Sequence, residues 1–219
     1  DIGFGQDADG DRLSVVSEQG IAIGEEFTLA FAADAMAERD CPGPLVTNLS
    51  TSRMIDEVGA RHGREVLRSK VGEVHVVETM IAAGAVGGGE GNGGVIDPTL
   101  RFCRDNLAAM ALILQGMAWR GCTVSDWAGS FAPSAIVKEK LECPAGRTQR
   151  AILALMRHYE GQRLDLTEGV KVFLEDGSWM HARPSNTEPI LRVIAEADDG
   201  DTARRLCDEA LEVAREAIG

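Results

Sequence analysis

Residues 44–94 read PLVTNLSTSRMIDEVGARHGREVLRSKVGEVHVVETMIAAGAVGGGEGNGG, and their pattern indicates the fold class of the first part of the chain. Short apolar runs, which predict strands, alternate in it with segments of helical spacing. The order is strand 44–49, helix 54–62, strand 64–68, helix 73–83 and a short, buried-looking run at 85–87. The glycine-rich segment 87–94 predicts a loop. Strands that alternate with helices favour a largely parallel sheet with helices on both faces.

The flanking residues continue this pattern in both directions. A strand is expected at 13–16 and a helix over 25–39. A long helix follows the glycine-rich segment and ends at Gly121. Its apolar stripe comprises Cys103, Leu107, Met110, Ala111, Leu114, Met117 and Ala118. We therefore expect residues 24–132 to form one α/β domain with a mixed, mostly parallel sheet.

The pattern changes in the last third of the chain. The predicted elements are strand 135–141, helix 147–159, strand 170–174, strand 179–183, strand 191–197 and helix 202–218. Gly177 provides the turn of a hairpin. Strands joined by short turns, with helices on one side, describe an antiparallel α+β domain at 133–219, with its boundary between Gly129 and Ser134.

The composition excludes several classes of protein. The chain of 219 residues is 44% hydrophobic and 26% charged, as is usual for globular domains. Its net charge of −13 argues against a nucleic-acid partner, because phosphate backbones are bound by basic patches. No apolar run approaches the roughly 18 residues of a membrane span, and no signal-peptide pattern is present, so a cytoplasmic protein is expected. The five cysteines form no C-x-x-C pair, which argues against a disulfide framework or a zinc site.

Three aspartates form the first candidate site. Asp7, Asp9 and Asp11 alternate in the sequence DADGDR, and Arg12 and the strand-like run at 13–16 follow them directly. Alternate residues of an extended chain share one face, so the three carboxylates can converge on one hard cation. An all-oxygen site suits Mg²⁺, and the adjoining arginine indicates a phosphate beside the metal.

Two other interpretations of these aspartates exist. Asp and Gly are common in solvated turns. The aspartates and Glu18 also match positions 1, 3, 5 and 12 of an EF-hand calcium loop. Arg12 stands where that loop requires glycine, however, and the following residues are strand-like. The magnesium interpretation is therefore preferred.

The glycine-rich segment 87–94 is the second candidate site. Six glycines among its eight residues allow backbone conformations closed to other residues. The two remaining side chains are Glu90, a hydrogen-bond acceptor, and Asn92, which both donates and accepts hydrogen bonds. Such a pair can bind neighbouring sugar hydroxyls. A flexible linker is the alternative, although a linker would not need these two side chains within an α/β unit.

The third candidate site is the segment 183–192, RPSNTEPILR. It places two guanidinium groups, two hydroxyls, an amide and several backbone N–H groups between two predicted strands, and these are the donors of a phosphate cradle. The candidate ligands are Arg183, Ser185, Asn186, Thr187 and Arg192. From residue chemistry alone, a polar hairpin stiffened by two prolines is an equally good interpretation.

In this order and at these separations, the three segments resemble the α-D-phosphohexomutase superfamily, which includes phosphoglucomutases, phosphomannomutases and phosphoglucosamine mutases. Residues 7–12 look like the family's metal loop, 89–94 like its sugar-binding loop and 183–192 like its phosphate-binding loop. The resemblance covers essentially the whole chain. It implies the end of domain 2 at 1–23, the α/β domain 3 at 24–132 and domain 4, with a TATA-box-binding-protein-like α+β fold, at 133–219.

The resemblance also implies a mechanism. A phosphoserine would donate its phosphoryl group to a hexose phosphate, and the resulting hexose bisphosphate would return its other phosphate to the serine. Mg²⁺ would be held by the three aspartates, and Arg12 would neutralise charge on the transferring group. The five candidate ligands in 183–192 would hold the phosphate that does not react, while Glu90 and Asn92 would bind the sugar hydroxyls.

The sequence departs from many family members at two positions. Asn92 stands where serine is usual, a form associated with archaeal-type phosphoglucosamine or phosphomannose mutases. Glu73, in KVGEVH, occupies a segment where other members place histidine or aspartate. It is therefore a candidate catalytic residue for proton transfer or orientation, and a carboxylate that stabilises a helix start is the alternative.

Family members carry their phosphoserine in a stretch resembling Thr-Ala-Ser-His-Asn-Pro, which this sequence does not contain. We therefore expect a C-terminal fragment that is inactive alone, whose partners are hexose phosphates and the missing N-terminal domains of the same protein. The alternative function is a non-catalytic phosphosugar-binding or regulatory protein that lacks the serine domain.

Overall fold

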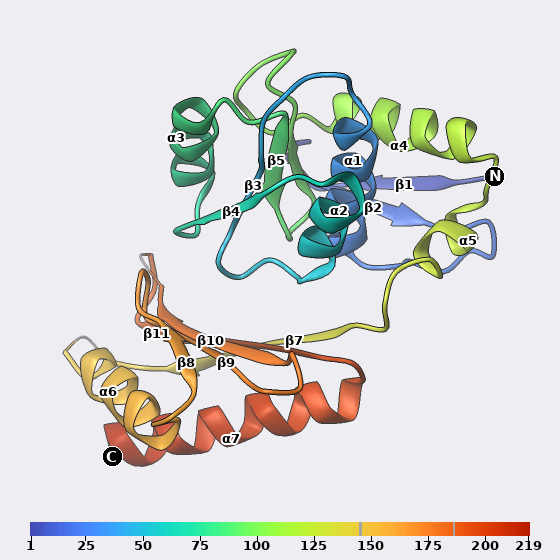
Figure 1. Ribbon diagram of the computed structural model, residues 1–219. Helices are drawn as coiled ribbons and strands as arrows, with labels where there is room; N and C mark the ends of the chain where they lie inside the picture. The colour runs from blue at the N-terminus through green and yellow to red at the C-terminus, as the bar shows by residue number, and fades with distance from the viewer. Residues whose placement is uncertain (145, 186) are drawn as a thin grey trace. The chain divides into compact units, whose positions relative to one another are not determined.

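A four-stranded sheet lies at the centre of residues 1–132, all of which are described (Figure 1). The computed structural model describes residues 1–144, 146–185 and 187–219 of the chain. The strands are β3 (Leu45–Asn48), β4 (Val66–Ser69), β5 (Gly87–Glu90) and β6 (Gly94–Ile96). β3 runs parallel to β4 and β5, and β6 is antiparallel to β5, in the order β4-β3-β5-β6. The predicted mixed, mostly parallel sheet is confirmed.

Helices cover both faces of this sheet, as predicted. They are α1 (Glu25–Ala37), α2 (Met54–His62), α3 (Glu73–Ala83), α4 (Asn106–Arg120) and the short α5 (Val124–Ala128), which the sequence pattern did not indicate. Figure 1 shows α3 on one side of the sheet, where Val76 and Met80 pack against Val46. α1, α2 and α4 lie on the other side in a larger core that encloses most of α1.

A two-stranded antiparallel ribbon precedes the sheet in the chain. Its strands are β1 (Gly3–Gln6), which the sequence pattern did not indicate, and β2 (Leu13–Val16), and the loop 7–12 joins them. Leu13 and Val15 of β2 are buried in the same core as α1. The loop with the three aspartates is thus attached to the packed interior of the 1–132 unit.

The glycine-rich segment 87–94 differs from the predicted loop, because its first half is the interior strand β5. The glycines permit close packing there. A Cβ on Gly87 would lie 2.5 Å from Sδ of Met36, and one on Gly88 would lie 2.4 Å from the carbonyl oxygen of Val46. Glycine inside a strand often marks such a close approach of a neighbouring backbone. The loop itself is confined to residues 91–93, between β5 and β6.

The apolar stripe predicted for the long helix faces the core only in part, through Met110 and Met117. α4 begins after its N-cap Asp105, so Cys103 lies outside the helix. Leu107 and Leu114 of the stripe are 73% and 47% exposed. The buried side is formed by Asn106, Ala108, Ala109, Leu112, Ile113 and Gly116. The helix is apolar around much of its circumference, so the spacing of apolar residues could not identify its core face.

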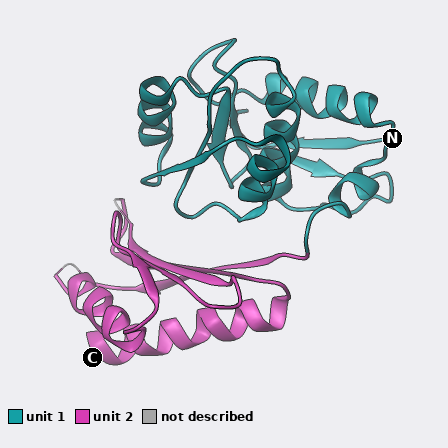
Figure 2. Ribbon diagram, viewed as in Figure 1, with its two compact units in different colours: residues 1–132 teal, residues 133–219 magenta. Residues whose placement is uncertain are grey.

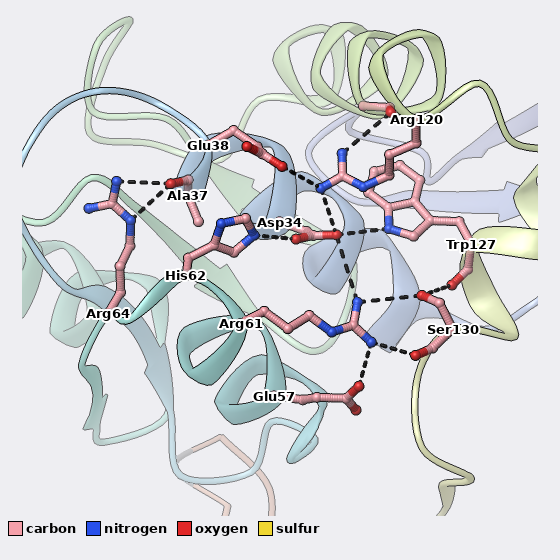
Figure 3. A network of polar contacts seen from close by, with 11 residues as sticks. Asp34, Ala37, Glu38, Glu57, Arg61, His62, Arg64, Arg120, Trp127 and Ser130 are labelled. Atoms are coloured by element: carbon pink, nitrogen blue, oxygen red, sulfur yellow. Dashed lines mark hydrogen bonds and ion pairs between the residues drawn. The ribbon is translucent and has the colours of Figure 1, made fainter.

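A buried carboxylate ties the helices of the 1–132 unit together (Figure 3). Asp34 of α1 is 2% exposed and accepts a hydrogen bond from Nε1 of Trp127 at 2.8 Å. Nη2 of Arg120 lies 3.0 Å from its Oδ2, and Nε2 of His62 lies 2.6 Å from its Oδ1. The Trp127 ring stacks on Phe31 with ring centroids 4.2 Å apart. One carboxylate therefore connects α1, α2, α4 and α5.

Residues 133–219 form a second compact unit (Figure 2). Its described strands are β7 (Ala135–Glu142), β8 (Arg163–Asp165), β9 (Val170–Phe173), β10 (Trp179–Pro184) and β11 (Ile190–Ala197). They pair antiparallel in the order β7-β11-β10-β9-β8. The helices α6 (Thr148–His158) and α7 (Gly200–Ile218) cover one face of this sheet (Figure 1).

The predicted antiparallel α+β fold is thus confirmed for the second unit, and β8 is an edge strand that the sequence pattern did not indicate. Across the described ranges of the whole chain, no helix has both the length and the apolar character needed to cross a bilayer.

Candidate functional site

The first candidate site is the loop between β1 and β2. Asp7, Asp9 and Asp11 each place one ligand atom within 4.8 Å of the other two, so the structure brings the three predicted metal ligands together. Oδ1 of Asp7 accepts hydrogen bonds from the backbone N–H groups of Asp11 at 3.1 Å and Arg12 at 3.0 Å. The bond from Arg12 is the main influence that holds the pKa of Asp7 below its usual value. Burial raises the pKa of Asp11.

The three carboxylates of this loop are suitable ligands for a small divalent cation. Mg²⁺ prefers oxygen ligands in octahedral geometry, and three carboxylates leave coordination positions for water and a phosphate oxygen. Two arginines border the cluster. Nε of Arg12 lies 3.9 Å from carboxylate oxygens of Asp7 and Asp11, and Nη2 of Arg104 lies 2.8 Å from Oδ2 of Asp11. Such positive charge beside the metal ligands suits an anionic substrate.

The second candidate site begins at the end of β5. Glu90 is 4% exposed, and its Oε1 accepts hydrogen bonds from Nδ2 of Asn48 at 2.8 Å and from the backbone N–H of Gly72 at 2.9 Å. Its Oε2 lies 3.9 Å from Nη1 of Arg104. One oxygen of Glu90 therefore joins the end of β3 to the segment that follows β4, and the other faces Arg104.

Two threonines that the sequence analysis did not single out hold the glycine-rich loop. Oγ1 of Thr47 donates to the carbonyl oxygen of Gly89 at 2.9 Å, and the N–H of Gly91 donates to Oγ1 of Thr51 at 3.1 Å. The pattern that could have identified these threonines in the sequence is a pair of hydroxyl side chains four residues apart at the end of an apolar strand. Asn92 is half-buried, and its Oδ1 accepts the N–H of Gly94 at 3.2 Å.

The start of β2, directly after the loop 7–12, is hydrogen-bonded to the glycine-rich loop. The N–H of Leu13 donates to the carbonyl oxygen of Gly93 at 3.1 Å, and Nδ2 of Asn106 donates to the carbonyl oxygen of Arg12 at 3.0 Å. Gly93 has a φ of +86°, and a Cβ there would lie 2.4 Å from the carbonyl oxygen of Leu13, so the junction requires glycine. The two loops therefore share one frame within residues 1–132.

Glu73, the first residue of α3, is paired with Arg104. Its Oε1 accepts the backbone N–H of Arg104 at 2.9 Å, and its Oε2 accepts Nε of the same residue at 3.1 Å. The guanidinium of Arg104 also contacts Asp11 and Glu90, so Glu73 is connected to both loops. Sequence reasoning missed Arg104, whose signal is slight because it is one basic residue beside a helix cap.

The third candidate site lies in the second unit, where β10 turns into β11. Arg183 and Arg192 are directly opposite each other in the β10–β11 register, so their side chains share one face of the sheet. Like charges at opposite positions destabilise a sheet, which favours an anion beside them. Acidic groups balance part of this charge: Glu168 Oε1 lies 3.4 Å from Nη1 of Arg183, and Glu188 Oε2 lies 3.2 Å from Nη2 of Arg192.

The turn between these arginines presents hydroxyl groups. The N–H of Ser185 donates to the carbonyl oxygen of Ile190 at 3.0 Å, and the N–H of Thr187 donates to Oγ of Ser185 at 3.4 Å. The two hydroxyl oxygens lie 3.4 Å apart. Asn186, also predicted as a ligand, lies outside the described residues. The other four predicted ligands come together at this end of the hairpin.

Comparisons with known proteins identify the family that this chain resembles. The family model described as "Phosphoglucomutase/phosphomannomutase, alpha/beta/alpha domain III" matches residues 24–134, and the model for the C-terminal domain of the same family matches residues 138–213. A probable phosphoglucosamine mutase of Methanopyrus kandleri is 34% identical, and a phosphoglucomutase/phosphomannomutase of Thermococcus kodakarensis is 33% identical. Each match covers 100% of this chain and 48% of the relative. The chain thus spans about half the length of the curated relatives that it matches.

Solved structures share the fold. A phosphoglucomutase/phosphomannomutase family protein of Burkholderia thailandensis matches with a TM-score of 0.81 and 24% identity, over 100% of this chain and 48% of that protein. The N-acetylphosphoglucosamine mutase of Aspergillus fumigatus, solved with GlcNAc-6P and magnesium, matches with a TM-score of 0.69 and 17% identity, over 100% of this chain and 49% of that one.

Proposed function

Because the chain belongs to the phosphoglucomutase/phosphomannomutase family, we propose that it is part of a phosphohexomutase that interconverts hexose 1-phosphates and hexose 6-phosphates. The observation that carries this proposal is the attachment of the metal loop to the sugar loop through Leu13, the residue directly after the metal loop, whose N–H donates to the carbonyl oxygen of Gly93 at 3.1 Å. A metal loop alone would suit many phosphoryl-transfer enzymes. A metal loop held against a hydroxyl-binding loop fits transfer of a phosphoryl group to or from a sugar.

The residues of the 1–132 unit have distinct roles in this proposal. Asp7, Asp9 and Asp11 would hold Mg²⁺, which when bound would supply Lewis-acid stabilisation of charge on the transferring phosphoryl group. Arg12 adds positive charge beside that group. Glu90 accepts hydrogen bonds from the sugar hydroxyls, and the amide nitrogen of Asn92 donates to them.

In the second unit, Arg183, Ser185, Thr187 and Arg192 bind the phosphate that is not transferred. Guanidinium groups form paired, charge-assisted hydrogen bonds with phosphate oxygens, and hydroxyls complete the set of donors. Binding energy from a phosphate remote from the reacting atoms favours the reaction. The phosphoryl donor in this proposal is a phosphoserine, which the hexose bisphosphate phosphorylates again at the end of each cycle. We assign this serine to the part of the relatives' sequences that this chain does not match.

Calorimetric titration of the chain in the presence of Mg²⁺ tests the binding part of this proposal. The relatives are named for glucosamine, glucose and mannose phosphates, so the ligands are the 6-phosphates of these three sugars. At least one is expected to bind more tightly than inorganic phosphate and than its own unphosphorylated sugar, because the sugar loop adds contacts that phosphate cannot make. Equal affinity for inorganic phosphate and all three sugar phosphates would contradict the proposal.

A further inference from the structure

We propose that Arg104 is a positioning residue that orients Asp11 of the metal loop and Glu90 of the sugar loop at the same time. The inference rests on the proposed function of these two loops. Arg104 lies outside the three sequence motifs. Its single guanidinium group would then control the geometry of both the metal loop and the sugar loop.

The guanidinium of Arg104 directs its nitrogens at three carboxylates. Nη2 lies 2.8 Å from Oδ2 of Asp11, Nε lies 3.1 Å from Oε2 of Glu73, and Nη1 lies 3.9 Å from Oε2 of Glu90. The group is planar, and its donors point in fixed directions. When two of these contacts are made, the direction of the third is therefore determined. A lysine ammonium has the charge but not this fixed fork.

Arg104 is itself held in place before any ligand binds. Its side chain is 15% exposed, and its backbone N–H donates to Oε1 of Glu73 at 2.9 Å. Its Cδ lies so close to Gly94 that a Cβ on that glycine would approach it to 2.4 Å. Glu73 thus binds both the backbone and the side chain of Arg104, and Gly94 provides the space for the aliphatic part. Glu73 acts in this arrangement as a support for Arg104.

The contact with Asp11 is of the kind that tunes a metal site. Because Arg104 binds Oδ2 of Asp11, the second carboxylate oxygen, Oδ1, is the one that can bind a cation. Carboxylates that bind metals are commonly fixed by such outer partners, whose loss lowers metal affinity by about 10- to 100-fold. The contact with Glu90 acts on the oxygen that is not already used by Asn48 and Gly72.

The test is a titration of the chain with Mn²⁺, a paramagnetic substitute for Mg²⁺. Binding is measured from the broadening of backbone amide signals in NMR spectra. This readout measures weak affinities and needs no enzymatic activity. Arg104→Gln keeps hydrogen-bonding groups without the charge, and Arg104→Lys keeps the charge without the fork. Both are expected to raise the Mn²⁺ dissociation constant by about tenfold or more. Arg101→Gln is the matched control, because Arg101 is 63% exposed and pairs with Asp105.

Double-mutant cycles then show whether Arg104 acts through its two proposed targets. In an Asp11→Asn background, Arg104→Gln should have little further effect on Mn²⁺ affinity, and in a Glu90→Gln background it should have little further effect on hexose phosphate affinity. Additive losses in both cycles would overturn the proposal, because they would show that Arg104 acts elsewhere. Native affinity in Arg104→Lys would overturn it as well, since charge alone would then suffice.

The proposed function and this inference fail in different ways. If the native chain shows no saturable broadening around residues 7–12, the metal site of the proposed function is wrong, and the inference is overturned with it. If the native chain binds Mn²⁺ and both Arg104 variants bind it equally well, the inference alone is overturned. Thermal unfolding of each variant shows that it is folded, and Arg104→Lys decides the outcome if Arg104→Gln does not fold.

Discussion

Arg183 illustrates how the place of a side chain in a sheet supports the function proposed for it. It lies on β10 directly opposite Arg192 on β11, and its side chain is only 13% exposed. A guanidinium this far from bulk solvent interacts more strongly with an anion than an exposed one does, because screening by water is weaker. Glu168 at 3.4 Å neutralises part of the charge of Arg183.

Arg183→Ala should therefore lower the affinity for every hexose phosphate and for inorganic phosphate alike. The loss of a charge-assisted contact should cost roughly 2 kcal/mol or more, and it should be independent of the sugar. Calorimetric titration measures it, with Arg150→Ala on the exposed side of α6 as the control. Unchanged phosphate affinity in the Arg183 variant would refute the assignment of this turn.

The sequence predicted some site residues and not others for a physical reason. Asp7, Asp9 and Asp11 lie within one short loop, so their convergence follows from local backbone geometry. The role of Arg104 depends on contacts with Asp11 and Glu90, which are distant in the chain. Such contacts exist only after the sheet and α4 have packed, and no local pattern encodes them.

At the scale of elements, β5 shows how composition can mislead. A glycine-rich run favours a loop because glycine weakens strands. Here the glycines form an interior strand because Met36, Val46 and Met80 occupy the space where side chains would lie. The strand could not be predicted from its own residues, because the reason for the glycines lies in α1, β3 and α3. By contrast, α2 and α3 have the predicted bounds, since their spacing and glycine ends are local signals.

Gly88→Ala tests this explanation of β5. The added methyl group would lie 2.4 Å from the carbonyl oxygen of Val46 and 2.9 Å from Sδ of Met80, so backbone must move. Overpacking of this kind should lower the free energy of unfolding by about 1–3 kcal/mol. Urea unfolding followed by circular dichroism measures it. Gly200→Ala, where no atom lies within 4 Å of the new Cβ, is the control. Equal stability of the two variants would show that β5 tolerates side chains.

The contacts of Asp34 allow a second test at this scale, because they connect four helices (Figure 3). Asp34→Asn keeps the shape of the side chain and removes the charge that faces His62 and Arg120. Loss of one partner of a buried ion pair typically costs 3–5 kcal/mol, and we expect about 2–3 here because the Arg120 side chain is 22% exposed. Urea unfolding measures the change, and Asp208→Asn on the exposed side of α7 should leave stability unaltered. A loss as small as that of the control would mean that Asp34 does not hold the helices together.

At the scale of the whole molecule, the proposed function is divided between two units. The metal and sugar loops belong to residues 1–132, and the phosphate loop belongs to residues 133–219. The fold class of both units could be predicted from the order of strands and helices. The net charge of −13 opposes anion binding, so the proposed function assigns the phosphate groups to local donors, Arg12, Arg183 and Arg192.

The most direct measurement is the steady-state conversion of hexose 1-phosphates to 6-phosphates, in Mg²⁺, by the complete gene product that contains this chain. The proposed function predicts turnover of at least one of the glucosamine, mannose and glucose phosphates. Chelation of Mg²⁺ or the Asp9→Asn substitution should abolish that turnover without unfolding the protein, whereas Asp208→Asn should leave it intact. Absence of turnover with all three substrates in the folded native protein, or undiminished turnover in the Asp9→Asn variant, would contradict the proposed function.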